Sequence, residues 1–593
     1  MTDTLQQRWN LDTVFPGGSA SPQFQDFLDA LTADIEQFAL DLGTKNASKD
    51  VNEWVSMIEK VQNLADRQRE AGAFVSCLEA ADMKDRGAKA LRGRISQQSA
   101  QLNSVFTTFD ALLTNLPESM FAALLQDERL QTVGFGLEER RRRAKERLHP
   151  DQEQLISALM VDGYHGWSQL YDTVVGRMTL SLDREGQQTN LSMGQAHNKL
   201  SAPDKAVRDE VFSKWEQAWA SEEDIFGDTI NHLAGFRLAV YKRRGWDSVL
   251  KEPLDINRMD ETTLSTMWDV INQNKHHFVD YLKTKARLLR LDKLGWQDVE
   301  APIGSTSRLV PYEEARAFIV SQFREFSPDM AAFADSCFEN RWIESEDRPG
   351  KRPGGFCTSF PVNEQTRVFT TYSGTIGNVA TLAHELGHAY HQHVMRGLPR
   401  FAQSYAMNVA ETASTFAEMV VADASLRFAK DKDERISLLD DKLRRSVAMF
   451  MNIHARFLFE TQFYEERKQG LVSVQRLNEL MENAQKQAYD GALGSYHPRF
   501  WASKLHFYIT GTPFYNFPYT FGYLFSTGIY AKARQVGPAF ANQYVALLRD
   551  TASMRVEDLA AKHLGVNLRG PEFWQEAIDT LLTDVSEFME LTK

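Results

Sequence analysis

An H-E-x-x-H motif constrains this chain more than any other feature, because it places three chemically active side chains in one predicted helix. The motif runs from His384 to His388 within a helical pattern over residues 377–391. Histidines four residues apart lie on one helical face, about 6 Å apart along the axis, so both imidazoles can bind one ion. Zinc accepts neutral imidazole and favours tetrahedral sites. Glu385 follows the first histidine, in position to take a proton from a zinc-bound water.

The residues around the motif help to separate a metal site from a chance match. H-E-x-x-H also arises by chance in unrelated helices. Here alanine, threonine and leucine come shortly before the motif, so one helical face is apolar and we expect the helix to be buried. Burying two histidines and a glutamate without partners is costly, and a bound metal removes that cost.

A third protein ligand is expected downstream, because a catalytic zinc usually takes three protein ligands and keeps one position for water. The next apolar helical segment, residues 408–419, carries Glu411 and Glu418 close to one face. Glu411 follows His388 by 23 residues, which suits a helix, a loop and a returning helix. The alternative is that both glutamates are ordinary polar positions.

These motifs resemble the thimet oligopeptidase and oligoendopeptidase F family of zinc metallopeptidases. That family carries H-E-x-G-H and, some two dozen residues later, a third glutamate ligand in an E-x-x-S context. This chain has Glu411-Thr-Ala-Ser414 at that place. The resemblance covers most of the chain after about residue 200, is visible again at residues 8–15, and is closer to the oligoendopeptidase F branch.

The resemblance implies both a site and a fold. By it, His384, His388 and Glu411 bind one zinc ion per chain, and Glu385 is the general base. The implied fold is mainly α, a multi-helix peptidase of two lobes that enclose a deep substrate channel, with a small β-sheet beside the metal helix.

The hydrophobic pattern along the chain agrees with a helical protein. Helical periodicity begins near residue 21, and a strand-like stretch interrupts it at residues 173–182. We expect a boundary soon after that stretch. It separates an N-terminal helical lobe of oligoendopeptidase F type, residues 1–195, from a zinc metallopeptidase catalytic domain, residues 196–593.

Two further strand-like stretches come just before the motif helix, at residues 355–361 and 367–373. An extended peptide substrate can add to the edge of such a sheet, which would place its scissile bond over the metal. The alternative is a small structural sheet, and the two interpretations are compatible.

A late stretch rich in aromatic residues offers candidate hydrogen-bond donors. Pro513 is expected to start a helix, on which Tyr515, Tyr519 and Tyr523 would share one face. Core packing explains many aromatic stripes, but peptide hydrolysis also needs donors to the tetrahedral oxyanion. The family has a histidine followed by spaced tyrosines in this role, which makes His506, Tyr515 and Tyr519 the candidates here. The choice among the three tyrosines stays open.

Composition excludes some partners. The formal charge of −13 argues against nucleic acid and against anionic membranes, and no apolar run is long enough to span a bilayer. The chain has no evident signal peptide, and its three cysteines form no disulfide pattern, so we expect a cytoplasmic protein.

These observations predict a zinc-dependent metalloendopeptidase that hydrolyses internal bonds of short peptides. One alternative is a carboxypeptidase or dipeptidase on the same site, which a cluster able to grip a terminal carboxylate would favour. Another is a helical binding protein whose metal is structural or absent. The sequence does not determine the cleavage preference or the oligomeric state.

Overall fold

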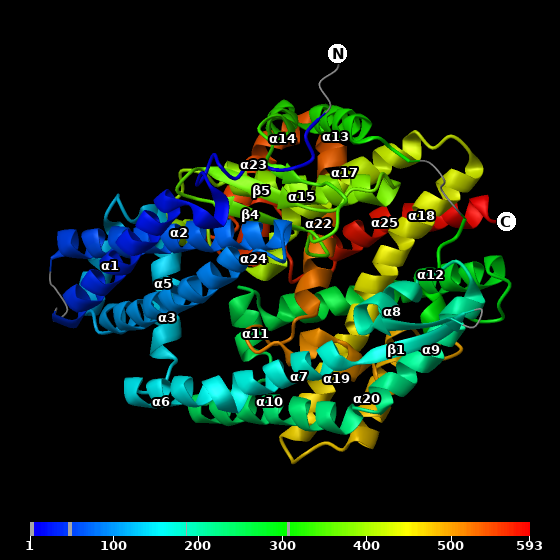
Figure 1. Cartoon of the computed structure of the whole chain (residues 1–593), viewed down its shortest axis with the longest axis horizontal. Helices are drawn as coiled ribbons and strands as arrows, with labels where there is room; N and C mark the ends of the chain where they lie inside the picture. The colour runs from blue at the N-terminus through cyan, green and yellow to red at the C-terminus, as the bar shows by residue number, and fades with distance from the viewer. Residues whose placement is uncertain (1–4, 45–49, 185–186, 305–308) are drawn as a thin grey trace. The chain divides into compact units, whose positions relative to one another are not determined.

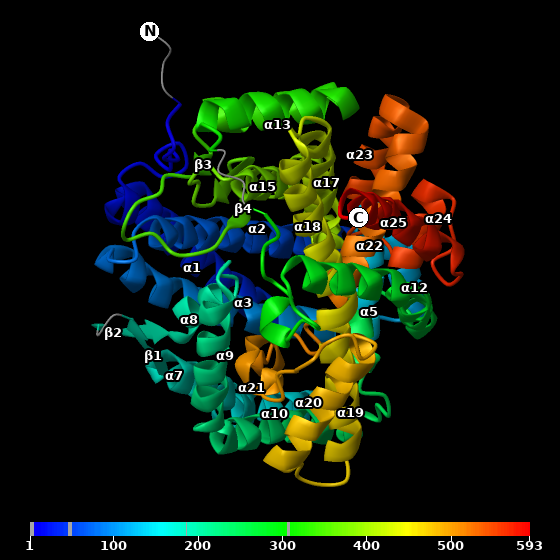
Figure 2. The same ribbon diagram turned by 90° about the vertical axis from the view of Figure 1, so that its right-hand side faces the viewer.

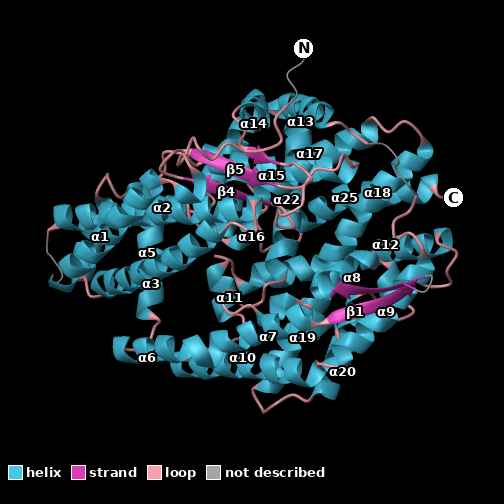
Figure 3. Ribbon diagram, viewed as in Figure 1, coloured by secondary structure: helices cyan, strands magenta, loops and turns pink. Residues whose placement is uncertain are grey.

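The computed structural model describes residues 5–44, 50–184, 187–304 and 309–593. Figure 3 shows that the described chain is largely helical, with strands confined to two small sheets. The predicted mainly α fold is therefore confirmed. Among the described helices, none combines the length and apolar character needed to cross a membrane.

The chain forms two compact units that alternate along the sequence. The first unit comprises Met1–Arg147, Arg308–Ala424 and Lys532–Gly565, and the second comprises Leu148–Ser307, Ser425–Ala531 and Val566–Lys593. Each unit is described by itself below. The expected division into an N-terminal lobe, residues 1–195, and a catalytic domain, residues 196–593, stays a prediction.

Helices dominate the first unit and surround one sheet (Figure 1). Its helices are α1 (Pro22–Thr44), α2 (Val51–Ala81), α3 (Arg86–Thr114), α4 (Glu118–Gln126), α5 (Gly134–Lys145), α13 (Tyr312–Phe326), α14 (Pro328–Glu339), α15 (Ile376–Val394), α16 (Met407–Ala410), α17 (Thr412–Arg427), α23 (Ala541–Asp550) and α24 (Val556–Leu564). Its strands are β3 (Ile343–Glu344), β4 (Phe356–Phe360) and β5 (Gln365–Phe369). The unit boundaries fall inside α17 and α22.

The second unit is also helical and holds one two-stranded antiparallel sheet. Its helices are α6 (Pro150–Met160), α7 (Gly166–Arg177), α8 (Met193–Lys199), α9 (Lys205–Ala220), α10 (Glu223–Arg244), α11 (Lys251–Ile256), α12 (Glu261–Leu288), α18 (Lys432–Val447), α19 (Ile453–Arg467), α20 (Val474–Ala488), α21 (Phe500–Ser503), α22 (Phe517–Val536) and α25 (Glu572–Leu591). Its strands are β1 (Thr179–Arg184) and β2 (Gln187–Ser192).

Side-chain caps define where several of the first unit's helices begin. Asp50 and Asp85 accept hydrogen bonds from backbone N–H groups in the first turns of α2 and α3. Thr375 and Asn378 form a reciprocal capping box at the start of α15. Such caps satisfy N–H groups that have no partner inside the helix, so they fix each boundary locally.

The sheet of the first unit has the strand order β3-β5-β4, with β4 at one edge. β4 pairs antiparallel with β5, which confirms both strands predicted before the motif helix. α2 packs on the sheet through a cluster of buried side chains that includes Phe74, Phe360 and Phe369. Figure 1 shows α15 beside the same sheet. The small sheet next to the metal helix is thus present as expected.

Two local predictions are wrong. Residues 173–177 end α7, and only residues from Thr179 onward form strand β1. Pro513 does not start a helix, because Phe514 takes a left-handed backbone conformation (φ 51°) and α22 begins at Phe517. A left-handed residue ends any helical run that a first-turn proline would otherwise begin.

Candidate metal centre

The two motif histidines lie together on α15, one helical turn apart. Their ring centroids are 4.9 Å apart and the ring planes are nearly perpendicular, at 85°. Both Nε2 atoms turn toward the same carboxylate oxygen, Glu411 Oε2. The helix spacing therefore does what the motif predicts, since it directs two imidazoles at one point.

Glu411 reaches the histidines because α15 and α17 approach each other very closely. A Cβ atom at Gly387 would lie 2.5 Å from the carbonyl oxygen of Ala413 and 2.7 Å from Ser414 Cα, so only glycine fits between the two histidines. Figures 1 and 2 both show α15 and α17 side by side. The continuous helix expected over residues 408–419 is broken, and Glu411 stands between α16 and α17.

The three side chains have the separations that one metal ion requires. Glu411 Oε2 lies 3.3 Å from His384 Nε2 and 3.4 Å from His388 Nε2. Ligands about 2.0–2.1 Å from a tetrahedral zinc are themselves roughly 3.3 Å apart. Among the described residues, this is the one group of histidine, cysteine and acidic side chains with such geometry. The donor set therefore fits a divalent metal.

Two further side chains contact the candidate ligands. His384 Nδ1 lies 3.1 Å from Glu418 Oε2, and the Glu418 side chain is buried. Ser414 Oγ donates a hydrogen bond of 2.7 Å to Glu411 Oε2. Partners of this kind fix the tautomer and direction of metal ligands. The sequence placed Glu418 close to the same helical face as Glu411 but gave it no role of its own.

Glu385 is buried beside the candidate ligand group and is not a member of it. It is 7% exposed, and its Oε2 has no hydrogen-bond partner among the described residues. Burial raises the pKa of Glu385. The neighbouring His388 and His384 act to lower this pKa, and the negative charge of Glu411 acts to raise it further. Gly355, just before β4, leaves room for it, since a Cβ there would come within 3.0 Å of Glu385 Oε1.

Glu411 has the opposite electrostatic balance. Burial by itself would raise its pKa, but hydrogen bonds and charge from His384 and His388 outweigh burial and hold the pKa of Glu411 well below its ordinary range. An ionised carboxylate next to two imidazoles is the protonation state that a metal ligand needs.

The predicted oxyanion residues gather in the second unit. His506, Tyr515 and Tyr519 form a cluster in which ring centroids are 5.0 Å apart for His506–Tyr515, 6.0 Å for His506–Tyr519 and 5.3 Å for Tyr515–Tyr519. All three side chains are half-buried. Burial, followed by the charges of Arg456 and Lys504, lowers the pKa of His506 to about 3.

Tyr523 does not belong to this cluster. Its side chain is buried, its hydroxyl shares a hydrogen bond of 2.9 Å with Ser446 Oγ, and its ring packs against Phe450. It is therefore a core residue with a satisfied hydroxyl. Tyr515 precedes α22 while Tyr519 lies in its first turns, so the two phenols converge without sharing one helix.

Comparison with known proteins identifies the family. The model of peptidase family M3 matches residues 199–580, and the oligopeptidase F model matches residues 113–179. The chain belongs to peptidase family M3. Within M3, its relatives place it in the oligoendopeptidase F branch.

The similar proteins are distant in sequence, but some of them match nearly the whole chain. Oligopeptidase PepF of Bacillus subtilis is 20% identical over 594 residues, covering 99% of this chain and 87% of the relative. A solved structure of oligoendopeptidase-F from Enterococcus faecium has 18% identity and a TM-score of 0.71, covering 96% of this chain and 98% of that one. A structure from Chlamydophila abortus reaches a TM-score of 0.84 at 19% identity, covering 99% and 98%.

Membership of M3 makes this protein a metallopeptidase that acts on oligopeptides. The family implies a divalent metal, for which the His384, His388 and Glu411 group is available. A helical binding protein whose metal is structural or absent, one of the two alternatives, is thereby set aside.

Proposed function

We propose that the protein is a zinc metalloendopeptidase that hydrolyses internal peptide bonds of short oligopeptides. The observation that carries this proposal is the convergence of His384 Nε2 and His388 Nε2 on Glu411 Oε2, at 3.3 and 3.4 Å. Two imidazoles and one carboxylate form a three-ligand set of the type found in catalytic zinc sites, which leaves a fourth position for water.

Each residue of the site has a separate task. His384, His388 and Glu411 would hold the zinc, and Glu418 and Ser414 orient two of these ligands. When bound, zinc supplies a Lewis acid for the substrate carbonyl and lowers the pKa of water to about 7.

Glu385 is the proposed general base. Its buried carboxylate lies beside the ligands and has an oxygen without a hydrogen-bond partner among the described residues. Such a group can accept the proton of the attacking water and pass it to the leaving nitrogen.

His506, Tyr515 and Tyr519 are proposed as hydrogen-bond donors to the tetrahedral oxyanion. What supports this is their mutual proximity and their partial exposure, which distinguish them from the core residue Tyr523. Preorganised donors stabilise charge that develops only in the transition state.

The setting of the enzyme is also a proposal. Cys77, Cys337 and Cys357 are free thiols, which fits a reducing cytoplasm. The formal charge of −13 fits an enzyme of short peptides better than a partner of nucleic acid or membranes.

Mass spectrometry of a peptide-library digest tests the function directly. We expect new termini inside the peptides, loss of cleavage with a chelator, and recovery when zinc is added back. Release of single residues or dipeptides from one end only would instead favour the carboxypeptidase or dipeptidase alternative. Cleavage that persists in the chelated, metal-free protein would contradict the proposal.

A further inference from the structure

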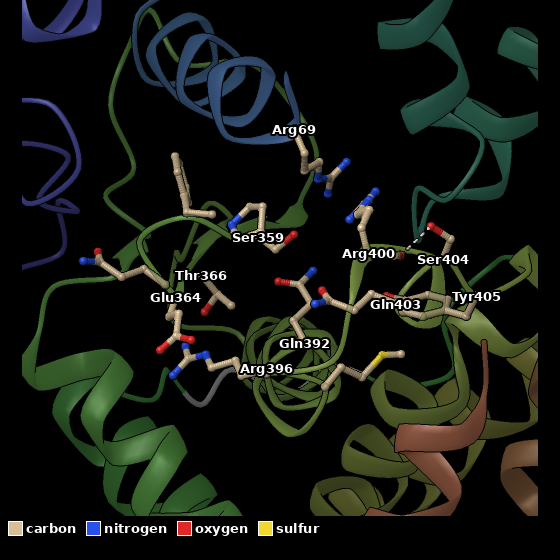
Figure 4. Close-up of a pocket in the computed structure, with 15 residues that line it drawn as sticks. Arg69, Ser359, Glu364, Thr366, Gln392, Arg396, Arg400, Gln403, Ser404 and Tyr405 are labelled. Atoms are coloured by element: carbon tan, nitrogen blue, oxygen red, sulfur yellow. Dashed lines mark hydrogen bonds between the residues drawn. The ribbon is translucent and has the colours of Figure 1, made fainter. Parts of the chain in front are cut away.

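A pocket in the first unit lies next to the metal helix and belongs to no part of the site described so far. Its volume is about 330 Å³, and it is lined by the end of β4, the β4–β5 turn, the start of β5, the last turn of α15 and the loop that follows. α2 contributes one side chain, Arg69. Figure 4 shows Gln392 of α15 pointing into the centre of this space.

Two arginines make one side of the pocket cationic. Figure 4 shows the guanidinium groups of Arg69 and Arg400 directed toward one another. Arg69 Nη2 donates to Thr358 Oγ1 at 3.3 Å, which holds it against the edge strand. Burial and then the charge of Arg69 lower the pKa of Arg400. Arg400 Nε lies 3.9 Å from Asp66 Oδ1, beyond hydrogen-bond distance.

The opposite side of the pocket is closer to neutral. There Arg396 lies near Glu364, whose negative charge acts on it. Arg400 is in turn partly offset by Asp66, so of the two sides the one with Arg69 and Arg400 keeps the excess positive charge. Two guanidinium groups that face one another suit an anion, because guanidinium binds carboxylates through paired hydrogen bonds.

The pocket lies close to the proposed catalytic residues, and its distance from them follows from residue counts along α15 and along β4. On α15, Gln392 comes one turn after His388, about 6 Å along the axis. Along the edge strand, Gly355 faces Glu385 while Ser359 lines the pocket, and four residues of extended chain span about 13 Å. Cys357 Sγ ties the two elements together through a hydrogen bond of 3.6 Å to Gln392 Oε1.

We propose that this pocket binds a carboxylate of the peptide substrate, about three to five residues from the scissile bond. This rests on the proposed peptidase function and adds to it a rule about which peptides bind. A peptide extended along β4 from Gly355 would bring such a residue to Ser359, within reach of Arg69 and Arg400. A bound carboxylate would accept paired hydrogen bonds from the two guanidinium groups, and its negative charge would offset their mutual repulsion.

Two sources can supply this carboxylate. A peptide parallel to β4 would present its C-terminus to the pocket, whereas an antiparallel one would present an aspartate or glutamate side chain on the amino side of the scissile bond. The first case would set the distance between the cleaved bond and the C-terminus. The second would set a preference for an acidic residue.

Affinity selection from a nonapeptide library tests the pocket without turnover. The zinc-loaded Glu385→Gln protein is incubated with peptides that differ only in a C-terminal acid or amide, or in aspartate or asparagine at each position. Bound peptides are quantified by mass spectrometry. We expect at least one carboxylate-bearing member of a pair to bind about tenfold or more tightly than its neutral partner.

Variants then locate the preference. Arg69→Gln combined with Arg400→Gln in the same background should remove it, while Arg94→Gln, which alters a surface ion pair with Asp29, should leave it intact. Since Arg400 is half-buried, circular dichroism and zinc content check the double variant. If it does not fold, Arg69→Gln alone is used, because Arg69 is exposed and should still weaken the preference severalfold.

The outcomes separate the two proposals. Preference in the acid–amide pairs identifies the C-terminus, and preference in the aspartate–asparagine pairs identifies a side chain. Equal binding of every pair, or a preference that survives the double variant, would overturn the pocket proposal even if the wild-type protein digests the library. Failure of that digest would overturn the peptidase proposal, while the binding comparison would still decide the pocket.

Discussion

His384 Nδ1 lies 3.1 Å from Glu418 Oε2, while Nε2 of the same imidazole faces Glu411. The ring is therefore held from both sides by carboxylates that belong to one short region of chain around the start of α17. With Nδ1 donating to Glu418, Nε2 keeps its lone pair for a metal. This relationship places Glu418 against the candidate metal ligand His384, outside the group of three that could hold the ion.

Glu418→Gln should weaken metal binding and leave the fold intact. Glutamine can still accept the Nδ1 hydrogen bond but loses the negative charge, and losing an outer partner of this kind typically costs about 10–100-fold in metal affinity. Competition against a chelating dye measures the change. The exposed Glu128→Gln on the first unit serves as the control. Unchanged affinity in Glu418→Gln would show that this contact does not support the ligand.

Glu411→Gln should lower zinc content sharply. The amide is a much poorer zinc ligand than a carboxylate, while its oxygen can still accept the hydrogen bond from Ser414 Oγ, so packing should survive. Zinc per chain, measured by atomic emission after dialysis, and the far-UV spectrum together separate metal loss from unfolding. Full stoichiometric zinc in this variant would remove Glu411 from the ligand set.

Glu385→Gln should retain zinc and lose activity. The side chain lies outside the ligand group, so metal content should match wild type, whereas loss of a general base costs about 10²–10⁴-fold in turnover. Steady-state hydrolysis of one peptide from the digest, at equal zinc content, measures the effect. Near-normal turnover with zinc present would contradict the assigned role.

Tyr515→Phe and Tyr519→Phe should act on kcat, whereas Tyr523→Phe should act on stability. Loss of one oxyanion donor typically lowers kcat by about 10²–10³-fold with little change in KM. The Tyr523 hydroxyl instead shares a hydrogen bond with Ser446 in the core, so loss of this hydroxyl should lower Tm and leave kcat nearly unchanged. Each variant is measured for both quantities. Wild-type kcat in Tyr515→Phe and Tyr519→Phe would reject the donor assignment.

Glu460→Gln should remove a pH dependence of stability in the second unit. Burial raises the pKa of Glu460 from 4.5 to about 8, so between these values the folded chain binds a proton that the unfolded chain has lost. Stability then falls as pH rises through this window, by about 1.4 kcal/mol per pH unit from this group.

The variant should keep the hydrogen bond from Asn516 Nδ2 and lose this dependence, so its Tm should exceed that of wild type increasingly from pH 5.5 to 8.5. As a control, Glu465→Gln replaces an exposed glutamate on the same helix, and the Tm of this variant should change with pH as the Tm of wild type does. If the Tm of Glu460→Gln changes with pH in the same way as the Tm of wild type, Glu460 is not the source of the pH dependence.

Local patterns account for what could be predicted. The pairing of His384 with His388 follows from 3.6 residues per turn, and the strands before α15 follow from their alternating and β-branched residues. The pairing of Glu411 with the histidines was predicted from spacing and family resemblance, and the structure brings these side chains together. The start of α22 was wrong, because the left-handed backbone of Phe514 is not visible in a hydrophobic pattern.

The sequence by itself determined the helical class, the motif helix with its two histidines, and the small sheet beside it. These depend on backbone hydrogen bonds and side-chain periodicity between residues a few positions apart. Only the tertiary structure decided that Glu418 supports His384, and that Arg69 of α2 meets Arg400. Both depend on contacts between distant segments, such as the close approach of α15 and α17 at Gly387, whose energy comes from packing and burial that no local pattern encodes.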